Sequence, residues 1–522
     1  MKQAPLSLDA GATQHGDGYV TDFEYTHGYY AELNPTRIRL ALLMAGFAPP
    51  SFENACELGY GQGVSLNVHA AASGAQWWGT DFNPAQAASA WALARSSGNG
   101  AQVADQSFAE FAARTDLPDF DFIGLHGIWS WVSDDNRAVI SDFIRRKLRV
   151  GGVAYVSYNT QPGWAAFAPV RHLMAQHAEV IGAAGQGLLS RVDEAIGFVE
   201  RLAATDPAFM RAHPQIRQRM EGIKGQNRRY VAHEYFNQHW TPMHFATVAE
   251  RLASARMTHA CSANFLERLD WLNLTPAQSD FLAEIPDAHF RESVRDFMTN
   301  QQFRRDYWIK GPRRLNAYDR NEALREIRVV LMVPRSAVPL KVGGALGQAS
   351  MNPAVYEPIL QYLSDQKAHR IAEVEQEVAA AGVTFAQVIE AVMTLVGTGH
   401  LAPAQTESEV NAAAAPAAAL NEALCRQARG SSEISVLASP LIGGAVAVNR
   451  FSQLFLQARR QGYTEPVQWA REVQVILAAQ GQKLLRNGVA LEPGEPTLAL
   501  LTEQATQFAS SDLRVLQELG VS

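Results

Sequence analysis

A glycine-rich segment at residues 57–63 has the composition and spacing of a ligand-binding loop. It follows a short apolar run and leads into a helical pattern that begins near Val64. Gly59 and Gly61 carry no side chain, so the chain can turn tightly there and bring backbone amides close to a ligand. A dinucleotide-binding loop of the form GxGxxG would need a third glycine at position 64, which is valine. The spacing therefore disfavours NAD, and a glycine-rich turn without any ligand is the alternative.

Two carboxylates end the next two predicted strands. Asp81, after the second strand, is placed to accept hydrogen bonds from both hydroxyls of a ribose. It also precedes Asn83–Pro84, so an Asx turn or helix cap is the alternative interpretation. Asp105 ends the third strand, where a carboxylate can accept from an adenine amino group, and Gln106 and Ser107 follow it. A nucleoside ligand is consistent with both positions.

The fourth predicted strand opens into an aromatic segment that begins at His126. A histidine can move a proton near neutral pH, but many histidines only form structural hydrogen bonds. Trp129 and Trp131 follow, and the face of an indole ring attracts a positive charge. For both tryptophans, packing in the hydrophobic core is as good an explanation as contact with a ligand. The strand end thus combines a titratable group with rings suited to a cationic centre.

Short apolar runs alternate with helical patterns between residues 50 and 160, which is typical of βαβ units and a parallel sheet. Ligands of such sheets bind at the carboxyl ends of the strands, where all the residues above lie. The predicted fold class is therefore α/β, with a Rossmann-like, doubly wound domain. Its first five strands are predicted at Ala55–Leu58, Gln76–Asp81, Ala101–Asp105, Phe120–His126 and Val153–Asn159.

A helical pattern follows the fifth strand, from Trp164 to about Glu221 and again over Arg228–Trp240. The α/β pattern then returns and ends at Gly311. We predict a first domain over residues 18–312, with a helical insertion over about 164–300 that covers the mouth of the site. The returning elements are predicted as a helix over Pro242–Met257 and strands over Thr258–Phe265 and Arg304–Lys310.

Three short helical patterns between Pro353 and Pro403 end in a turn at residues 397–399. Their size and order predict a winged-helix-like middle domain over residues 313–402. Acidic residues outnumber basic ones there, so we expect packing or partner binding rather than DNA binding. The Ala- and Pro-rich composition of residues 403–420 predicts a linker, followed by a C-terminal domain over residues 421–522.

The overall composition excludes several classes of protein. Apolar residues make up 47% of the 522 residues and charged residues 19%, which is typical of a globular protein. A net charge of −7 gives no general attraction to nucleic acid or anionic membranes. Three widely separated cysteines fit a reducing, cytoplasmic setting. The N-terminus lacks the pattern of an export signal, and the most apolar stretch, Leu437–Val448, is shorter than the roughly 20 residues of a membrane span.

Taken as a set, these segments resemble bacterial class I S-adenosylmethionine-dependent methyltransferases that carry a methyltransferase regulatory domain. The likeness runs from about Tyr19 to Gly311 and includes the predicted insertion, which would contain the regulatory region. The rickettsial lysine methyltransferases of outer-membrane proteins have a similar order of domains. The segments that carry the likeness are residues 25–35, 57–63, 126–131, 158–164, 229–235 and 302–306.

This resemblance implies that the ligand is S-adenosylmethionine, with S-adenosylhomocysteine as the product. It implies that Glu57, Gly59, Gly61, Asp81 and Asp105 bind this cofactor. The other residues predicted on the cofactor side are Tyr60, Phe82, Gln106, Ser107, His126 and Trp129.

The resemblance also implies methyl transfer to protein lysine side chains, a reaction that requires no metal. A lysine amine has an unperturbed pKa of about 10.4 and must lose its proton before it attacks a methyl group. We predict that His126, Tyr25, Tyr158 and Asn159 orient this amine or pass its proton outward. His233–Glu234 are further candidates.

Two other functions are consistent with the sequence. A methyltransferase acting on a small molecule or a glycan would use the same loop above a closed pocket. A catalytically silent scaffold is disfavoured by the complete set of predicted cofactor residues. We expect a cytoplasmic enzyme with a protein substrate, no nucleic-acid partner and no membrane span, and a homodimer is one oligomeric state to test.

Overall fold

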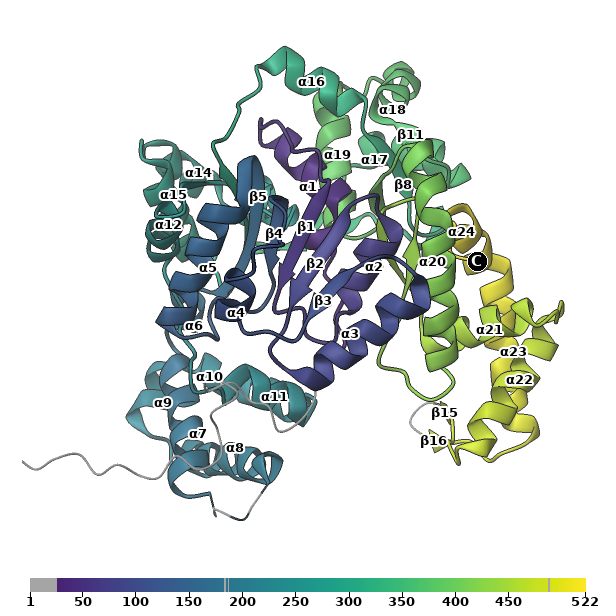
Figure 1. Cartoon of the computed structure of the whole chain (residues 1–522), viewed down its shortest axis with the longest axis horizontal. Coiled ribbons are helices and arrows are strands. Elements are labelled where there is room, and N and C mark those ends of the chain that lie inside the picture. The colour runs from purple at the N-terminus through teal and green to yellow at the C-terminus, as the bar shows by residue number, and fades with distance from the viewer. Residues whose placement is uncertain (1–25, 183–184, 186, 487–488) are drawn as a thin grey trace, which may run out of the picture.

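The computed structural model describes residues 26–522 apart from 183–184, 186 and 487–488, and its centre is a seven-stranded sheet. The strands lie in the order 3-2-1-4-5-7-6 (Figure 1). The first five are parallel, whereas β7 pairs antiparallel with both β5 and β6. The bounds are β1 Asn54–Leu58, β2 Gln76–Thr80, β3 Gln102–Ala104, β4 Phe120–Leu125, β5 Leu148–Asn159, β6 Met257–Ser262 and β7 Phe303–Lys310.

Helices cover both faces of this sheet, as a doubly wound fold requires. On one face α1, α2 and α3 contribute Leu42, Leu66 and Ala90 to a core with Phe122 of the sheet. On the other face α4, α5 and α12 pack against the remaining side chains. The bounds are α1 Pro35–Met44, α2 Val64–Ala72, α3 Pro84–Ser97, α4 Phe108–Ala112, α5 Asp134–Lys147 and α12 Phe245–Ala253.

The predicted strands agree with the structure within one to three residues at most ends. The exception is β5, which begins at Leu148 rather than Val153. Leu148 caps α5 and already pairs with Phe120 of β4, so the helix leads into the strand without a loop. Gly151 lies in this early part with φ +85°. The pairing with β4 shifts its register in this part of the strand, between Phe120 and Phe122.

The insertion after β5 is a helical layer with a core of its own. Figure 1 shows α7–α11 as a group at one end of the sheet. A second helical group, α13–α15, follows β6 and leads back into β7. The bounds are α6 Gln161–Trp164, α7 Ala168–Val180, α8 Leu188–Ala204, α9 Ala208–Ala212, α10 Gln215–Lys224, α11 Arg228–Tyr235, α13 Asp270–Asn273, α14 Pro276–Ala283 and α15 Ala288–Met298.

The middle region contains three helices at the predicted place together with small sheets. The strand order β11-β8-β12 is antiparallel, and the hairpin β9–β10 precedes the helices. Among the described helices none is by itself long and apolar enough to cross a membrane. The bent pair Ile371–Ala381 and Phe385–Gly397 reaches the length and apolar composition of a membrane span only when the two helices are taken together. The bounds are α16 Ala317–Arg325, β8 Arg328–Leu331, β9 Lys341–Gly344, β10 Gly347–Ser350, α17 Pro353–Tyr362, β11 His369–Arg370, α18 Ile371–Val378, α19 Phe385–Gly397 and β12 Leu401–Ala404.

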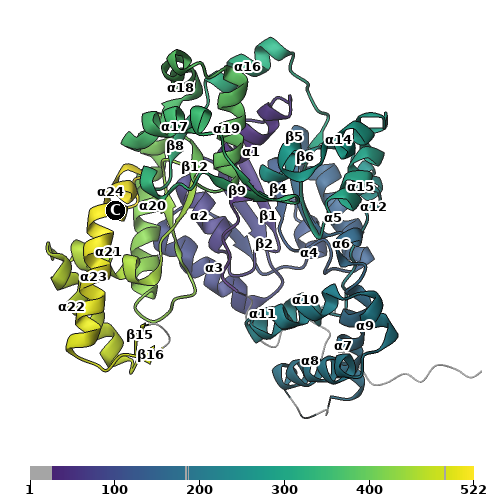
Figure 2. The same ribbon diagram turned by 180° about the vertical axis from the view of Figure 1, so that it is seen from behind.

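The prediction of a linker over residues 403–420 is wrong, because most of this segment belongs to the 21-residue helix α20, Glu407–Gln427. Alanine is the best helix former, and a capping box between Thr406 and Glu409 starts the helix. One face, with Ala417 and Leu420, is buried. Figure 2 shows α20 beside α2 and α3, which it contacts directly.

The C-terminal region is therefore joined to the first domain along α20. Gln405 donates from its amide nitrogen to the carbonyl of Ala72 at 2.8 Å. The amide of Asn34 donates to the carbonyl of Ile442 at 2.9 Å. The remaining bounds are β13 Val436–Ser439, β14 Gly444–Ala447, α21 Arg450–Arg460, α22 Pro466–Ala479, β15 Leu485–Arg486, β16 Val489–Ala490, α23 Glu495–Gln507 and α24 Leu513–Glu518.

Candidate active site

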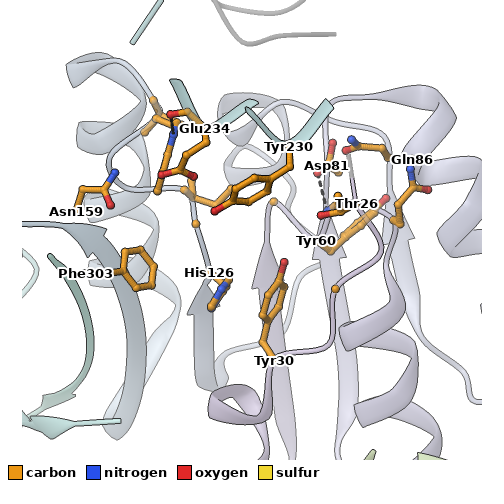
Figure 3. A pocket seen from close by; sticks show the side chains of 18 of the residues that line it. Thr26, Tyr30, Tyr60, Asp81, Gln86, His126, Asn159, Tyr230, Glu234 and Phe303 are labelled. Carbon is orange, nitrogen blue, oxygen red and sulfur yellow. Dashed lines mark hydrogen bonds between the residues drawn. The ribbon is translucent and has the colours of Figure 1, made fainter. Parts of the chain in front are cut away.

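A cavity of about 650 Å³ lies where the strand ends of the sheet meet the helical insertion. The strand ends contribute residues of the glycine-rich loop and the loops after β2, β3, β4 and β5, and α10 and α11 cover them. Figure 3 shows Asp81, Tyr60 and Gln86 on one side and Asn159 and Glu234 on the other. The cavity thus has two sides, which we call the loop side and the helix side.

The glycine-rich loop lines the loop side, as predicted from the sequence. Gly59 and Gly61 have φ values of +72° and +57°, in the left-handed region that favours glycine. A Cβ atom at Gly59 would lie 2.3 Å from the side chain of Ile128, so the close approach of these two loops also requires glycine. The amide nitrogen of Gly61 donates to Asp81 Oδ2 at 2.9 Å, which links the loop to the end of β2.

Asp81 makes the Asx turn considered for it in the sequence and also lies at the cavity, where ribose binding was predicted. Its Oδ1 accepts from the backbone nitrogen of Asn83 at 3.0 Å, which is an Asx turn. The same carboxylate lines the cavity although it is only 7% exposed. Burial raises the pKa of Asp81 to about 6, against the opposing hydrogen bonds from Asn83 and Gly61. Because a carboxylate offers about four lone pairs, acceptor capacity is left for a ligand.

The loop after β3 reaches the cavity through Gln106 and Ser107 and not through Asp105. Asp105 is exposed and does not line the cavity, so the structure does not place its carboxylate at the predicted position. Gln106 Oε1 is buried and has no hydrogen-bond partner among the described residues. The neighbouring Tyr60 donates its hydroxyl to the carbonyl of Ala104 at 2.7 Å. Gln106 and Ser107, rather than Asp105, are therefore the polar residues that this loop contributes to the cavity.

Glu57 lies behind the loop rather than in the cavity. Its side chain is 1% exposed, and its Oε2 has no hydrogen-bond partner within the described part of the chain. Burial, and then the charge of Asp81, raises the pKa of Glu57 to about 8. Glu57 is therefore protonated at neutral pH in this structure.

His126 lies in the centre of the cavity wall, at the end of β4. Its ring stacks on Tyr30 with the centroids 3.5 Å apart, and its Nδ1 lies 2.9 Å from the Tyr155 hydroxyl. Burial lowers the pKa of His126 to about 4, with a further decrease from Arg305 and an opposing contribution from Glu32. The imidazole is therefore neutral at physiological pH.

Asn159 and Tyr158 end β5, but only Asn159 lines the cavity. Successive side chains of a strand point to opposite faces, so adjacent residues cannot both reach one site. The Tyr158 hydroxyl instead donates to Asp306 Oδ2 at 2.9 Å on the other face of the sheet. The prediction of Tyr158 as a catalytic residue is corrected accordingly, whereas Tyr25 lies outside the described residues.

The two tryptophans after β4 also lie in different places. Trp129 is fully buried in the core formed with α5 and α12 and does not line the cavity. Trp129 is therefore a core residue, and the prediction that it contacts the cofactor is corrected. Trp131 lines the helix side, where its indole nitrogen donates to the carbonyl of Glu234 at 3.4 Å. Phe82, beside Asp81, lines the loop side as predicted.

Several lining residues were not singled out in the sequence because they lie on no strand end. Tyr30 precedes α1, Tyr230 lies on α11, and Arg219 lies on α10. Tyr30 belongs to a segment that carries the family resemblance, which is the one signal that points to it. Arg219 stacks its guanidinium over the Trp164 ring at 3.7 Å. These residues meet only because the insertion folds back over the strand ends.

Glu234, a further candidate in the sequence, lines the helix side, whereas its neighbour His233 is buried and does not. Burial raises the pKa of Glu234 to about 7, while Arg219 and Asn159 act in the opposite direction. Figure 3 shows Asn159, Tyr230 and Phe303 on the same side of the cavity as this carboxyl group. A carboxyl group with a pKa near neutrality can both accept and release a proton under physiological conditions.

The sheet order with β7 antiparallel, together with the glycine loop and carboxylate after the first two strands, defines a Rossmann-like methyltransferase fold. A model of the methyltransferase regulatory domain family matches residues 227–310. The chain is 36% identical over 511 residues to the uncharacterized protein sll1526 of Synechocystis, covering 97% of this chain and 99% of that protein. The chain belongs to the family of S-adenosylmethionine-dependent methyltransferases that carry this regulatory domain.

Two rickettsial proteins extend the comparison. The structure of PKMT2 from Rickettsia typhi in complex with AdoHcy aligns with a TM-score of 0.69 and 18% identity, covering 95% of this chain and all of that chain (100%). The uncharacterized protein RP789 of Rickettsia prowazekii is 23% identical over 333 residues, covering 61% of this chain and 58% of that protein. The likeness to PKMT2 establishes a shared fold along nearly the whole chain.

Proposed function

We propose that this protein transfers methyl groups from S-adenosylmethionine to lysine side chains of a protein substrate. The observation that carries the proposal is a single cavity with the glycine loop and Asp81 on one side and the carboxyl group of Glu234 among aromatic rings on the other. The resemblance to rickettsial lysine methyltransferases and the AdoHcy complex of PKMT2 support it.

The loop side fits S-adenosylmethionine. The left-handed glycines Gly59 and Gly61 open the backbone to a ligand, and Asp81 has acceptor capacity for the ribose hydroxyls. Gln106, which lines the cavity, takes the place proposed for Asp105 beside the adenine amino group. The volume of about 650 Å³ falls in the range of small-molecule sites, about 300–1,000 Å³. When bound, the cofactor supplies an electrophilic methyl group on a sulfonium.

The helix side fits an alkylammonium group. Tyr230, Tyr30 and Phe303 provide ring faces and edges that favour a cation and an aliphatic stem. The amine must lose a proton before it attacks, and desolvation among these rings lowers its pKa. Glu234, with a pKa of about 7, accepts this proton more readily than His126, with a pKa of about 4. We therefore propose that Glu234 accepts the proton of the amine and that His126 and Asn159 align the amine.

The middle region fits a supporting role in this proposal. Three helices and a three-stranded antiparallel sheet support a winged-helix-like module. Its hydrophobic side chains share one core with the first domain. We propose that it packs against the catalytic domain rather than binding nucleic acid.

Cofactor binding is tested by calorimetric titration of S-adenosylmethionine and S-adenosylhomocysteine. The wild type should bind both. Asp81→Ala should weaken binding by about 10- to 150-fold, because hydrogen bonds to a charged group contribute about 1.5–3 kcal/mol. Asp105→Ala is the matched control and should leave affinity within about twofold, since Asp105 is exposed and outside the cavity. The reverse order of effects would contradict this assignment.

The acceptor is tested by incubating the enzyme with radiolabelled S-adenosylmethionine and cell lysate. The label should enter the protein fraction and, after complete hydrolysis, migrate with N-methylated lysine. Label confined to small molecules or glycans would exclude the lysine proposal while leaving methyl transfer intact. The absence of any enzyme-dependent label, in spite of cofactor binding, would favour a silent scaffold.

A further inference from the structure

Residues 26–30, shortly before α1, contact both the active-site cavity and the C-terminal region. They belong to no helix or strand, so their position depends on contacts with other parts of the chain. Alternate residues of this segment line the cavity, namely Thr26, Gly28 and Tyr30. The residues between them, His27 and Tyr29, contact the C-terminal region. Because successive side chains of an extended chain point to opposite sides, this short segment joins the active site to the C-terminal region.

The C-terminal partner of the segment is the hairpin of β13 and β14. A Cβ atom at Gly444, the first residue of β14, would lie 2.4 Å from the Tyr29 hydroxyl and 2.5 Å from the Asn34 amide nitrogen. The φ of Gly444 lies outside the left-handed region, so the close approach of the two chains, rather than backbone conformation, requires glycine here. In the turn of the hairpin, the carbonyl of Ile442 accepts from Asn34 at 2.9 Å and from the Thr36 hydroxyl at 3.0 Å.

A buried histidine links the same segment to α2, the helix that follows the glycine loop. His69 is fully buried, and its Nε2 lies 3.2 Å from the carbonyl of Tyr30. Its Nδ1 lies 3.5 Å from the carbonyl of Gly443, in the turn of the hairpin. The Ser65 hydroxyl accepts from the backbone nitrogen of Tyr30 at 3.3 Å. The hairpin, α2 and the segment therefore meet around the backbone of Tyr30.

Tyr30 carries these contacts into the active site. Its ring stacks on His126 with the centroids 3.5 Å apart, and Figure 3 shows the two rings together in the cavity. The same view places Thr26 on the loop side, with Asp81. The segment thus contributes to both sides of the cavity. A displacement of its backbone would move the wall on the loop side and the ring against His126 at the same time.

We propose that the hairpin β13–β14 is a positioning element of the active site, with Gly444 and Tyr29 as its positioning residues. None of the described residues of the hairpin lines the cavity, so the hairpin acts through residues 26–30, which it holds in place. The inference rests on the proposed cofactor binding and methyl transfer, but not on the identity of the acceptor. It gives the C-terminal region a part in turnover.

The inference is tested with Gly444→Ala in the full chain, because the added methyl group collides with the Tyr29 hydroxyl and displaces the segment. Transfer of radiolabel from S-adenosylmethionine to lysate protein should slow about tenfold or more, since small displacements of groups in a site are costly. Calorimetry should show weaker binding of S-adenosylmethionine. Hydrogen–deuterium exchange should rise in the peptide that contains residues 26–34 and not in one from α5.

Gly430→Ala is the matched control within the C-terminal region. A Cβ atom at Gly430 would meet only the carbonyl oxygen of Gln427, at 3.9 Å, and its φ is not in the left-handed region. This variant should equal the wild type in transfer rate, cofactor affinity and exchange. All measurements are made well below the melting temperature of each variant, so that a loss of global stability alone leaves the rate unchanged.

Two further variants keep the test decisive. The double variant Tyr29→Phe/Gly444→Ala removes the hydroxyl that the new methyl group meets, and it should recover part of the rate that Gly444→Ala loses. Tyr29→Phe alone adds no bulk and should raise exchange of residues 26–34 even if Gly444→Ala fails to fold. Unchanged exchange in these variants, or raised exchange with unchanged rate and affinity, would overturn the inference. A wild type that neither binds S-adenosylmethionine nor transfers its methyl group would overturn the proposed function and this inference with it.

Discussion

His126 contributes to the active site as a neutral ring that holds its neighbours in place. It stacks on Tyr30 and bonds the Tyr155 hydroxyl, and both contacts set the wall that an acceptor amine would meet. We expect His126→Ala to slow single-turnover methylation about 10- to 100-fold, because small displacements of reacting groups are costly. Cofactor affinity should change less than threefold.

His126→Phe separates the two contacts of this side chain, since it keeps an aromatic face for Tyr30 and loses the bond to Tyr155. It should recover part of the rate if stacking is the main contribution. Rate constants and cofactor dissociation constants are measured for both variants. Weakened cofactor binding with an unchanged rate would instead place His126 among the cofactor-binding residues.

Glu234 should determine the pH dependence of turnover. A base must be deprotonated to act, so kcat/KM should rise with pH through a midpoint near 7, the pKa of this buried carboxyl group. We expect Glu234→Gln to lower kcat/KM by about 100-fold and to remove this step from the profile. If kcat/KM of the variant still rises with pH through the same midpoint, another group removes the proton.

Glu57 should make the stability of the ligand-free protein fall with pH. Its folded-state pKa, about 8, lies above the ordinary value of 4.5, so the folded state binds an extra proton between these values. The free energy of unfolding therefore decreases as pH rises from about 4.5 to 8 and is level above that range. Glu57→Gln removes this loss. The melting temperature of the variant should exceed that of the wild type by a few degrees at pH 8 and equal it near pH 4.5, and a constant difference would contradict this origin.

At the scale of elements, α20 joins the C-terminal region to the helices that follow the glycine loop. Ala417 is fully buried on the face toward α2 and α3, whereas Ala418 is exposed. Ala417→Leu should lower the free energy of unfolding by about 1–3 kcal/mol through overpacking. Ala418→Leu should change it by less than about 0.5 kcal/mol. Chemical denaturation of both variants checks this, and equal effects would argue against a tight α20 interface.

The whole molecule is held together by cores that cross the predicted domain boundaries. One core contains Leu42 of α1 and Leu395 of α19, although residue 312 lies between them. Another contains Val68 of α2 and Leu420 of α20. Buried contacts of this kind make domains fold and unfold together. The middle and C-terminal regions are thus parts of one body with the catalytic domain.

This arrangement also bears on nucleic-acid binding. Some basic side chains of the middle region face acidic partners, since Arg325 pairs with Glu375 at 2.7 Å and Arg370 lies 3.7 Å from Glu326. Acidic residues also outnumber basic ones between residues 353 and 403, so phosphate would be repelled there. A gel-shift assay of the full chain at moderate salt should retain no DNA. Tight binding that weakens steeply with salt would contradict the expectation.

Local patterns were sufficient to predict the sheet and the loop side of the cavity. Strands alternate with helices at short range, and Gly59, Gly61 and Asp81 follow strand ends, so their meeting point is a consequence of parallel strand order. Position within a strand was harder to predict. The choice between Tyr158 and Asn159, or between Trp129 and Trp131, depends on which face a side chain points to, and a shift of one residue reverses it.

The sequence by itself determined the fold class, the family and the strand ends at which we propose that the cofactor binds, because these depend on short-range spacing and on residue types at strand ends. Only the tertiary structure decided how the helix side is built. Glu234, Tyr230 and Arg219 reach the cavity from an insertion far along the chain, and the neutral state of His126 results from burial by that packing. It also decided that residues 403–420 are largely helical, since a buried face against α2 and α3 stabilises a composition that is otherwise typical of a linker.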